Sequence, residues 1–294
     1  MQNIILVDAY SQIYRCFFAI RSLTGADGQP VNALYGIARL LLTLDKSLHS
    51  AYGAVVFDKG KAVKRTAICP EYKAQRPPMP EEMRPQIEPI REWVKAFGWK
   101  IVEQEGLEAD DIIAAITRRR DGNKVTIITS DKDISQLTAD PEVLLALPDK
   151  GDTWKTTDAR AVQERFGVSP DSLLDYLALV GDTADNIIGL PGIGSKTAVK
   201  IINECGGIDA LLAHPETNPK LAAKLAAEQE LIARNRKLVA LDDELPASWQ
   251  GLESIARATP DCPRLIEMAR KTGFKSLLPI LEKRQEDTMQ PTLF

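Results

Sequence analysis

The chain has 294 residues, 44% of them hydrophobic and 27% charged, and it carries a formal net charge of −4. This length suffices for one large core or two domains, and the acidic balance argues against a generally basic nucleic-acid binder, so any such surface must be local. Four scattered cysteines and only two histidines argue against a zinc site and a His-dependent triad. Neither a signal peptide nor a membrane span of roughly 18 apolar residues is visible, so we expect a soluble cytoplasmic protein.

Three short apolar runs in the first half of the chain end on acidic residues. NIILVDAY closes on Asp8, AVVFDKG closes on Asp58, and KVTIITSDKD closes on Asp131 and Asp133. A short β-branched run that ends on a polar residue and precedes a helical pattern is typical of a buried parallel strand in an α/β sheet. We therefore predict such a sheet. Further strands are expected at about 100–102 and 143–147, with helices at about 33–47, 85–97 and 109–120.

Short amphipathic helices dominate the second half of the chain, from about Asp158 onward, and no convincing strand pattern is present there. One further helix is expected at about 263–283. The last stretch, RQEDTMQPTLF, is polar and then abruptly apolar, and we expect it to be disordered.

The stretch GLEADDIIAAI, residues 106–116, concentrates three carboxylates directly before an apolar helical run. A helix N-terminus explains one acid, and any single acid is more often a cap or a solvated charge, but three together are harder to explain. Acids at the carboxyl ends of neighbouring strands converge in the crevice of an open α/β sheet. Carboxylates without His or Cys suit Mg²⁺ or Mn²⁺, and two ions can clamp a phosphodiester. The predicted metal-site acids are Asp8, Asp58, Glu108, Asp110, Asp111, Asp131, Asp133, Asp182 and Asp185.

The stretch GLPGIGSKTAVKII, residues 189–202, is a candidate phosphate-binding hairpin. A Gly-Ile-Gly turn between two short helices presents backbone N–H groups to an anion, and glycine permits a close approach. The alternative is a simple helix-ending loop. The predicted DNA-binding residues of this hairpin are Gly192, Gly194, Ser195, Lys196, Thr197 and Lys200.

A basic strip from Lys59 to Arg76 carries six Lys or Arg against one Glu in an otherwise acidic chain. Such a run is usually a solvated face, but beside an acid-lined crevice it would guide a phosphate backbone. Tyr72, together with Tyr14 and Arg15, is a candidate for stacking on or holding an unpaired nucleotide. For the two tyrosines, packing in the core is an equal alternative.

Seven motifs occur in order between Ile4 and Leu281: LVDAYSQIYR, VNALYGIARLL, VVFD, YKAQRPPMPEE, GLEADD, TSDKD and LVGDTADNIIGLPGIGSKTA. In this set the chain resembles the 5′ nuclease (flap endonuclease) family, most closely the 5′–3′ exonuclease domain of bacterial DNA polymerase I. The resemblance implies a PIN-like α/β core with a mainly parallel central sheet and helices on both faces, plus a helical helix-hairpin-helix-like (H3TH) region. The implied domains are a nuclease core at 1–157 with a basic helical arch at about 59–90, a DNA-binding region at 158–284, and a flexible tail at 285–294.

The resemblance also implies the activity, which is hydrolysis of phosphodiesters near the single-strand/duplex junction of 5′ flaps by two Mg²⁺ or Mn²⁺, in RNA primer removal and DNA repair. It places Asp8, Asp58 and Asp110 near one ion and Glu108, Asp131, Asp133 and Asp185 near the other, with Asp111 and Asp182 in the outer shell. Lys73 and Arg76, with Arg65 as a lesser candidate, match arch residues at the scissile phosphate, so that Lys73, Arg76 and Asp110 form the expected catalytic set. Tyr14 matches a residue on which the terminal base stacks, and the hairpin of this family can hold K⁺.

The tail ends in QPTLF, which is similar to a bacterial sliding-clamp-binding pattern through Gln290, Leu293 and Phe294. In close relatives a polymerase domain follows the module, so a freestanding protein and an excised domain both remain open. The expected partners are branched DNA with a 5′ flap, RNA primer–DNA and a sliding clamp, for a monomer at the bacterial nucleoid without membrane contact. The alternatives are a non-catalytic DNA-junction binding module and an RNA-directed nuclease.

Overall fold

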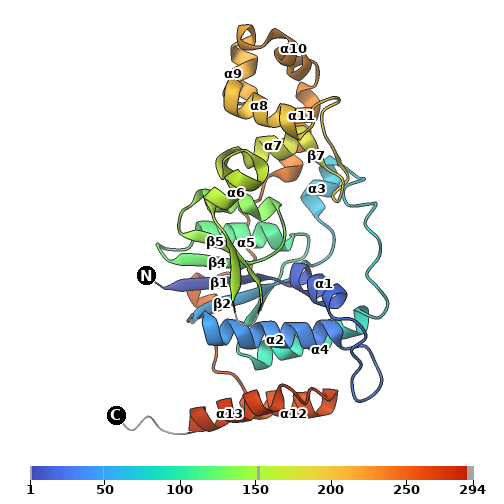
Figure 1. Ribbon diagram of the computed structural model, residues 1–294, viewed down its shortest axis with the longest axis vertical. Coiled ribbons are helices and arrows are strands. Elements are labelled where there is room, and N and C mark those ends of the chain that lie inside the picture. The colour runs from blue at the N-terminus through green and yellow to red at the C-terminus, as the bar shows by residue number, and fades with distance from the viewer. Residues whose placement is uncertain (1, 49, 151–152, 290–294) are drawn as a thin grey trace.

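The computed structural model describes residues 2–48, 50–150 and 153–289, and its centre is a six-stranded sheet (Figure 1). The strands lie in the order β3-β2-β1-β4-β5-β6, and each neighbouring pair is parallel except β5 and β6. This confirms the predicted α/β class with a mainly parallel sheet. The strands are β1 (Asn3–Asp8), β2 (Tyr52–Val56), β3 (Lys100–Val102), β4 (Lys124–Ile128), β5 (Val143–Pro148) and β6 (Trp154–Thr157).

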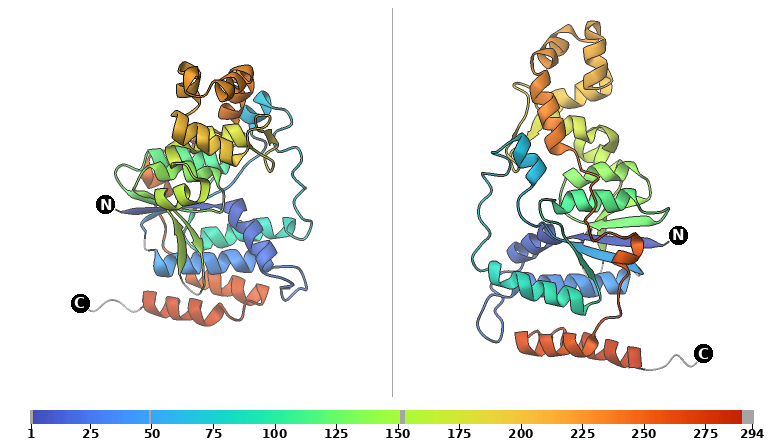
Figure 2. Two further views of the ribbon diagram at one scale, coloured as in Figure 1. Left: turned by 45° about the horizontal axis from the view of Figure 1, so that its top comes forward. Right: turned by 180° about the vertical axis from the view of Figure 1, so that it is seen from behind.

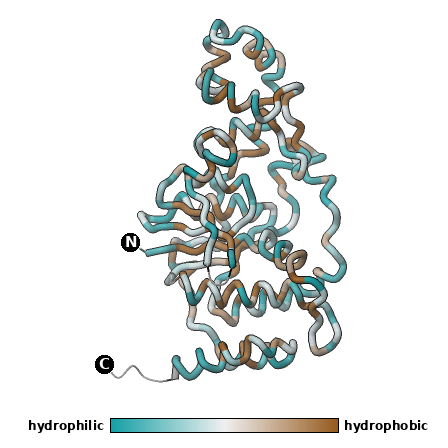
Figure 3. Tube along the Cα trace, in the orientation of Figure 1, coloured by the Kyte–Doolittle hydropathy of each residue, from teal (hydrophilic) through white to brown (hydrophobic). Residues whose placement is uncertain are grey.

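Both faces of the sheet are covered, and alternate residues of β1 show why. Ile5 and Val7 belong to a hydrophobic cluster with α1, α2 and α4, whereas Ile4 and Leu6 belong to a second cluster with α5. Because successive side chains of a strand point to opposite faces, one continuous apolar run serves both clusters. Figure 3 shows hydrophobic residues along the central strands and in the helices packed on them. The helices of this core are α1 (Ala9–Ala19), α2 (Asn32–Ser47), η1 (Arg84–Gln86), α4 (Ile87–Ala96), α5 (Ala109–Arg118) and η2 (Asp133–Ala139), close to the predicted ranges.

A second, helical region follows the sheet and has a hydrophobic cluster of its own, reaching from Val162 to Val239 (Figure 2). The prediction of a region without strands is wrong in one detail, because Gly181–Asp182 and Ile187–Ile188 pair as the short ribbon β7–β8. Strands of two residues leave no alternating pattern in a sequence. The helices of this region are α6 (Ala159–Phe166), η3 (Pro170–Ser172), α7 (Leu173–Val180), α8 (Ser195–Cys205), α9 (Ile208–Ala213), η4 (Pro215–Thr217), α10 (Pro219–Ala227) and α11 (Gln229–Val239).

The chain then returns to the sheet through η5 (Leu252–Ile255), and two further helices follow, α12 (Cys262–Thr272) and α13 (Leu278–Met289). The single helix expected at 263–283 is therefore wrong, because Gly273 adopts a left-handed conformation with φ 81° and ends α12. Leu265 and Leu281 pack in the cluster of α2 and α4, so these helices pack with the sheet and not with the helical region, which was predicted to extend to residue 284. Residues 285–289 continue α13 instead of starting a tail. Gln290, Leu293 and Phe294 lie outside the described residues.

The segment expected as a helical arch, residues 59–90, contains little helix before α4. It has one six-residue helix, α3 (Val63–Ile68), and η1, with turns and extended chain between them. Figure 2 shows this stretch running as a strap along one side of the molecule, from the helical region down to α4. Cys69 and Tyr72 pack in the hydrophobic cluster of the helical region, so the strap is anchored at that end.

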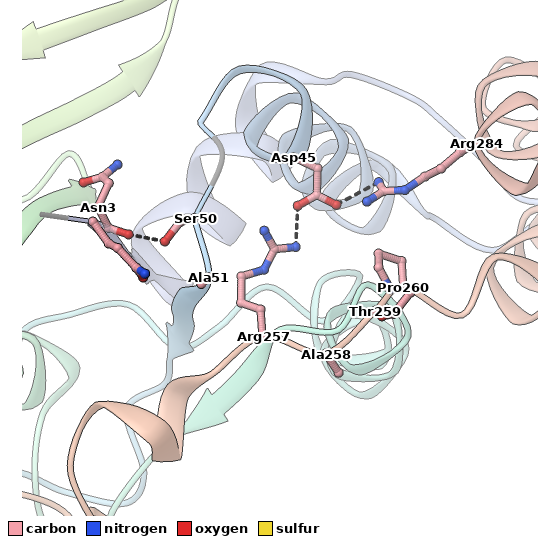
Figure 4. Close-up of a pocket in the computed structure, with 10 residues that line it drawn as sticks. Asn3, Asp45, Ser50, Ala51, Arg257, Ala258, Thr259, Pro260 and Arg284 are labelled. Atoms are coloured by element: carbon pink, nitrogen blue, oxygen red, sulfur yellow. Dashed lines mark hydrogen bonds and ion pairs between the residues drawn. The ribbon is translucent and has the colours of Figure 1, made fainter. Parts of the chain in front are cut away.

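A pocket of about 680 Å³ lies at the edge of the sheet where β1 begins (Figure 4). Asp45 of α2, whose side chain is only 4% exposed, forms ion pairs there with Arg257 and with Arg284 of α13, the latter at 2.8 Å. Arg257 also lies over the ring of Trp99, with 4.1 Å to the centroid. One carboxylate thus joins α2, the segment before α12, and α13. Within the described residues, every helix is too short or too polar to traverse a lipid bilayer.

Candidate active site

The predicted acids converge at the carboxyl ends of β1, β2 and β4. Asp8 lies opposite Val56 in the register of β1 and β2, and Val7 lies opposite Ile128 of β4, so the three strands end at one level. Because these strands are neighbours, the acids after them meet in one crevice. A cleft of about 790 Å³ opens there, and its acidic lining residues are Asp8, Asp58, Glu108, Asp110 and Asp131.

Backbone and hydroxyl donors position the first two acids. Asp8 is the N-cap of α1 and accepts from the backbone N–H of Ser11 at 3.2 Å and from Thr129 Oγ1 at 2.8 Å. Asp58 accepts from the backbone N–H of Ala109 at 3.0 Å, at the start of α5. Burial, and then the nearby charge of Asp58, raise the pKa of Asp8 to about 7; burial also raises the pKa of Asp58. Both groups therefore lie in a site where an anion is costly unless a cation compensates it.

Glu108, Asp110 and Asp111 form a first acidic group, since each offers a carboxylate oxygen within 4.8 Å of the others. Burial and the neighbouring charge of Asp111 raise the pKa of Asp110 well above its ordinary value. Asp111 itself is occupied from behind, because its two oxygens accept from Arg65 at 2.6 and 2.8 Å and one also accepts from the N–H of Asp242. Asp110 is thus the member with the fewest protein partners.

Asp133, Asp182 and Asp185 form a second buried acidic group within the same 4.8 Å limit. Burial and the charge of Asp131 raise the pKa of Asp133 to about 7, and its Oδ1 is buried without a hydrogen-bond partner among the described residues. A buried carboxylate oxygen without a hydrogen-bond donor is expected where the carboxylate serves as a metal ligand. Asp182 lies 3.0 Å from Lys132 Nζ.

The strap supplies the cationic side of the cleft. Lys73 pairs with Glu108 and lies 3.8 Å from Asp185, and Arg76 pairs with Asp185 at 2.6 Å. Although burial disfavours the charged form, Lys73 and Arg76 hold the pKa of Asp185 below its ordinary value. Among the described residues, the basic side chains that form ion pairs with the nine acids are Arg65, Lys73, Arg76 and Lys132. Nine carboxylates against four cations leave a surplus that fits two divalent ions.

Comparisons with known proteins identify the family. The family model of the 5′–3′ exonuclease N-terminal resolvase-like domain matches residues 3–167, and that of the 5′–3′ exonuclease C-terminal SAM fold matches residues 168–262. The chain belongs to the 5′–3′ exonuclease family. It is 35% identical to a 5′–3′ exonuclease of Aquifex aeolicus over the whole of both chains. It is also 35% identical to DNA polymerase I of Pseudomonas aeruginosa, where 94% of this chain matches 31% of the polymerase, so it spans about a third of that relative.

A solved structure of similar fold contains DNA and metal ions. The bacteriophage T5 flap endonuclease in a pseudo-enzyme-product complex with DNA and metal ions has a TM-score of 0.63 and 25% identity, covering 96% of this chain and 97% of that one. The predicted family, fold class and nuclease activity are thereby confirmed. The assignment of individual residues still depends on the geometry of the cleft.

Two predicted DNA contacts conflict with the structure. Arg65 is only 6% exposed and donates to Glu108, Asp111 and the carbonyl of Leu238, because α3 packs against α11. Its place is inside the protein, where it holds α5 and α11 together. Tyr72 is also 6% exposed, and its hydroxyl donates to Glu108 and Asp185, so it orients two acids and offers no face for stacking.

The remaining predicted contacts are available to a ligand. Tyr14 and Arg15 line the cleft, and Arg15 donates to the carbonyl of Pro148 at 2.9 Å. In the hairpin, Ile193 and Ala198 are buried while Gly192, Gly194, Ser195, Lys196 and Lys200 are exposed and Thr197 is half-buried. Gly192 has a φ of 64°, a left-handed backbone conformation that favours glycine. The hairpin lies in the helical region, where it leads into α8 (Figure 1).

Two residues of the site were missed from the sequence. Thr129 donates to Asp8, and Lys132 pairs with Asp182. Both belong to the motif TSDKD, whose acids alone were considered. A hydroxyl and an ammonium group next to the acids of this motif could have indicated that both residues contact them.

Proposed function

We propose that the protein is a structure-specific 5′ nuclease that hydrolyses phosphodiesters near the single-strand/duplex junction of 5′ flaps with two divalent cations. The observation that carries this proposal is an open cleft at the carboxyl ends of parallel strands, lined by Asp8, Asp58, Glu108, Asp110 and Asp131. The second buried acidic group adjoins it, because Asp185 pairs with Lys73 and Arg76 of the cleft wall. Carboxylate oxygens alone favour Mg²⁺ or Mn²⁺ as the ions.

The resemblance to the family assigns the acids to two ions. Asp8, Asp58 and Asp110 hold one ion, and Glu108, Asp131, Asp133 and Asp185 hold the other. Asp182 supports them from outside, as does Asp111, whose oxygens Arg65 already occupies. When bound, the ions supply an activated water and stabilise charge on the attacking and leaving oxygens.

Lys73 and Arg76 are the residues of the chain that act on the phosphate. In the structure they offset the charge of Glu108 and Asp185 from the wall of the cleft. A guanidinium and an ammonium placed there give charge-assisted hydrogen bonds to phosphate oxygens, which gain strength as negative charge develops. Their position on the strap lets them face both the acids and an incoming strand.

The substrate is a branched DNA, including RNA primer–DNA. The exposed hairpin holds the duplex through Gly192, Gly194, Ser195, Lys196, Thr197 and Lys200. Its backbone carbonyls also bind a K⁺ ion. Arg15 and Tyr14 hold the unpaired 5′ strand at the cleft. The molecule acts as a monomer in the bacterial cytoplasm at the nucleoid, in primer removal and repair, with Gln290, Leu293 and Phe294 as its sliding-clamp contact.

The two hydrophobic clusters support a division into a nuclease core and a DNA-binding region, with boundaries that differ from the predicted ones. The nuclease core comprises residues up to 157 together with α12 and α13, because these helices share its hydrophobic cluster. The DNA-binding region comprises residues 158–239, which share the other cluster.

Cleavage of a 3′-labelled 5′-flap duplex, with Mg²⁺ and with EDTA, tests the proposed function. A single Mg²⁺-dependent cut at the junction or one nucleotide from it is expected. Binding without cleavage would instead identify a non-catalytic junction-binding module. Faster cleavage of single-stranded RNA than of the flap would identify an RNA-directed nuclease.

A further inference from the structure

Helix α1 carries a row of aromatic side chains along the cleft. Tyr10, Tyr14 and Phe18 follow each other at intervals of four residues, which places them on one face of the helix. Tyr10 packs edge-on against Phe57, with centroids 5.8 Å apart, at the inner end of the row. Phe18 is 65% exposed at the outer end. The row therefore leads from the acids toward solvent.

Phe18 differs from an isolated exposed apolar residue, which would need no explanation. It lines the same cleft as Asp8, Asp58 and Asp110. Phe17, which packs on the core, contacts its ring edge-on, with centroids 5.2 Å apart and planes at 85°. This contact supports the ring from the protein side, while 65% of Phe18 remains exposed.

The rings of Tyr14 and Phe18 are nearly parallel, with planes at 28°, and their centroids are 6.3 Å apart. This separation lies in the range of an offset-stacked aromatic pair, so the two rings contact each other and form one aromatic surface. Phe18, which is 65% exposed, supplies the open part of that surface. A nucleobase has the size and the faces for such a site.

The surroundings favour a nucleobase over an apolar peptide. Arg15, between the two rings in sequence, is exposed at the same cleft and suits a phosphate. The strap cations and the metal-site acids also lie along this cleft, where the adjacent phosphodiester must reach the reacting position. A buried apolar side chain of a protein partner would gain nothing from these charges.

We propose that Phe18 and Tyr14 together form a two-ring stacking site for one unpaired nucleobase of the 5′ strand, with Phe18 as an additional substrate-binding residue. This inference depends on the proposed function, since it presumes a nucleic acid in the cleft. Stacking on aromatic rings tolerates any base, so the site selects an unpaired nucleotide and not a sequence. A base inside a duplex already has both faces covered, so the site favours an unpaired nucleotide over a nucleotide inside the duplex.

Fluorescence of 2-aminopurine at the unpaired nucleotide next to the junction of a 5′-flap duplex measures this contact in EDTA, without cleavage. Wild-type protein is expected to quench the probe. Phe18→Ala is expected to lose most of the quenching and to weaken binding about tenfold, the range for loss of one base–aromatic stack. Phe18→Trp restores both. Ile280→Ala, at an exposed residue of α13 with 52% exposure, is the matched control and behaves as wild type.

An abasic nucleotide at the probe position makes the test specific to stacking. On that substrate Phe18→Ala and wild type are expected to bind equally, whereas a merely structural defect would weaken both substrates. Equal behaviour of Phe18→Ala and Ile280→Ala on the intact flap, while wild type still cuts it with Mg²⁺, overturns the inference and leaves the proposed function standing. Failure of wild type to cut any flap overturns the proposed function instead.

Discussion

Two places in this molecule bury carboxylates beside guanidinium groups, and they differ in charge balance. At the pocket of Figure 4, the single carboxylate of Asp45 meets both Arg257 and Arg284. In and beside the cleft, nine acids share four basic partners among the described residues. Burial also raises the pKa values of Asp8 and Asp133 to about 7, which marks uncompensated charge. A matched carboxylate joins elements of the fold, whereas a surplus of carboxylates forms a site for external cations.

The largest expected effect is on catalysis, from Asp110→Asn in the cleft. Loss of a metal-site carboxylate should lower the cleavage rate by about 10³-fold, or ~4 kcal/mol. The melting temperature of the metal-free protein should stay unchanged or rise, because the amide removes repulsion with Asp111 and Glu108. Flap cleavage and thermal unfolding in EDTA measure the two effects. Asp171→Asn, at an exposed acid of η3, should change neither. Full activity of Asp110→Asn would remove this residue from the metal site.

Asp45→Ala is expected to lower stability without lowering the cleavage rate. The substitution leaves two guanidinium groups without their carboxylate, so the free energy of unfolding should fall by about 3 kcal/mol, the lower end for a broken buried pair because Arg284 is 28% exposed. The pocket lies where β1 begins and the cleft lies where β1 ends, so the cleavage rate per folded molecule should not change. Urea unfolding and flap cleavage at low temperature check both statements. A loss of activity without a loss of stability would show that the pocket is not purely structural.

Lys73→Ala tests whether the ammonium group of Lys73 occupies a position beside Glu108 that a metal ion also requires. Without the ammonium on Glu108, the acids should bind Mg²⁺ or Mn²⁺ several-fold more tightly, whereas cleavage should fall by about 10²-fold because the phosphate loses a cation. Isothermal titration with Mg²⁺ and single-turnover cleavage report these opposite changes. Lys64→Ala is the control, since Lys64 pairs with Asp242 and Glu244. Unchanged metal affinity would confine the role of Lys73 to the substrate.

The convergence of Asp8, Asp58 and Asp131 was predictable because it depends on local patterns. Apolar runs that end on Asp8, Asp58 and Asp131 are visible in the sequence, and parallel strands bring their carboxyl ends together wherever the helices pack. The strand at 100–102 and the helix at 33–47 lie within one residue of β3 and α2. These elements need no knowledge of distant contacts.

Features that depend on distant contacts were not predictable. The basic strip cannot show that α11 covers Arg65, so a charge pattern was mistaken for a surface. Tyr72 left core packing and stacking equally open, and only its hydrogen bonds to Glu108 and Asp185 decide between them. The return of α12 and α13 to the core depends on pairs such as Asp45 with Arg284, whose members are far apart in the sequence.

The smallest expected effect is a pH dependence of stability in the metal-free protein. Asp8 and Asp133 have pKa values near 7 when folded and an ordinary value of 3.8, so the folded state binds more protons between these limits. Their contribution to stability is complete below about pH 4 and is lost as the pH rises through about 7. Asp185 and Asp140, whose pKa values are lowered, act only below that window and do not cancel the trend.

Thermal unfolding in EDTA between pH 5.5 and 7.5 should therefore show a melting temperature that falls by several degrees, at about 2–4 °C per kcal/mol for a chain of this class. Asp133→Asn should flatten the slope, whereas Asp171→Asn should leave it in place. Saturating Mg²⁺ should reverse the trend, because the ionised carboxylates bind the metal and higher pH then favours the folded complex. A melting temperature that rises with pH in EDTA would mean that the surplus charge of the cleft is compensated within the protein, and the contrast with Asp45 would disappear.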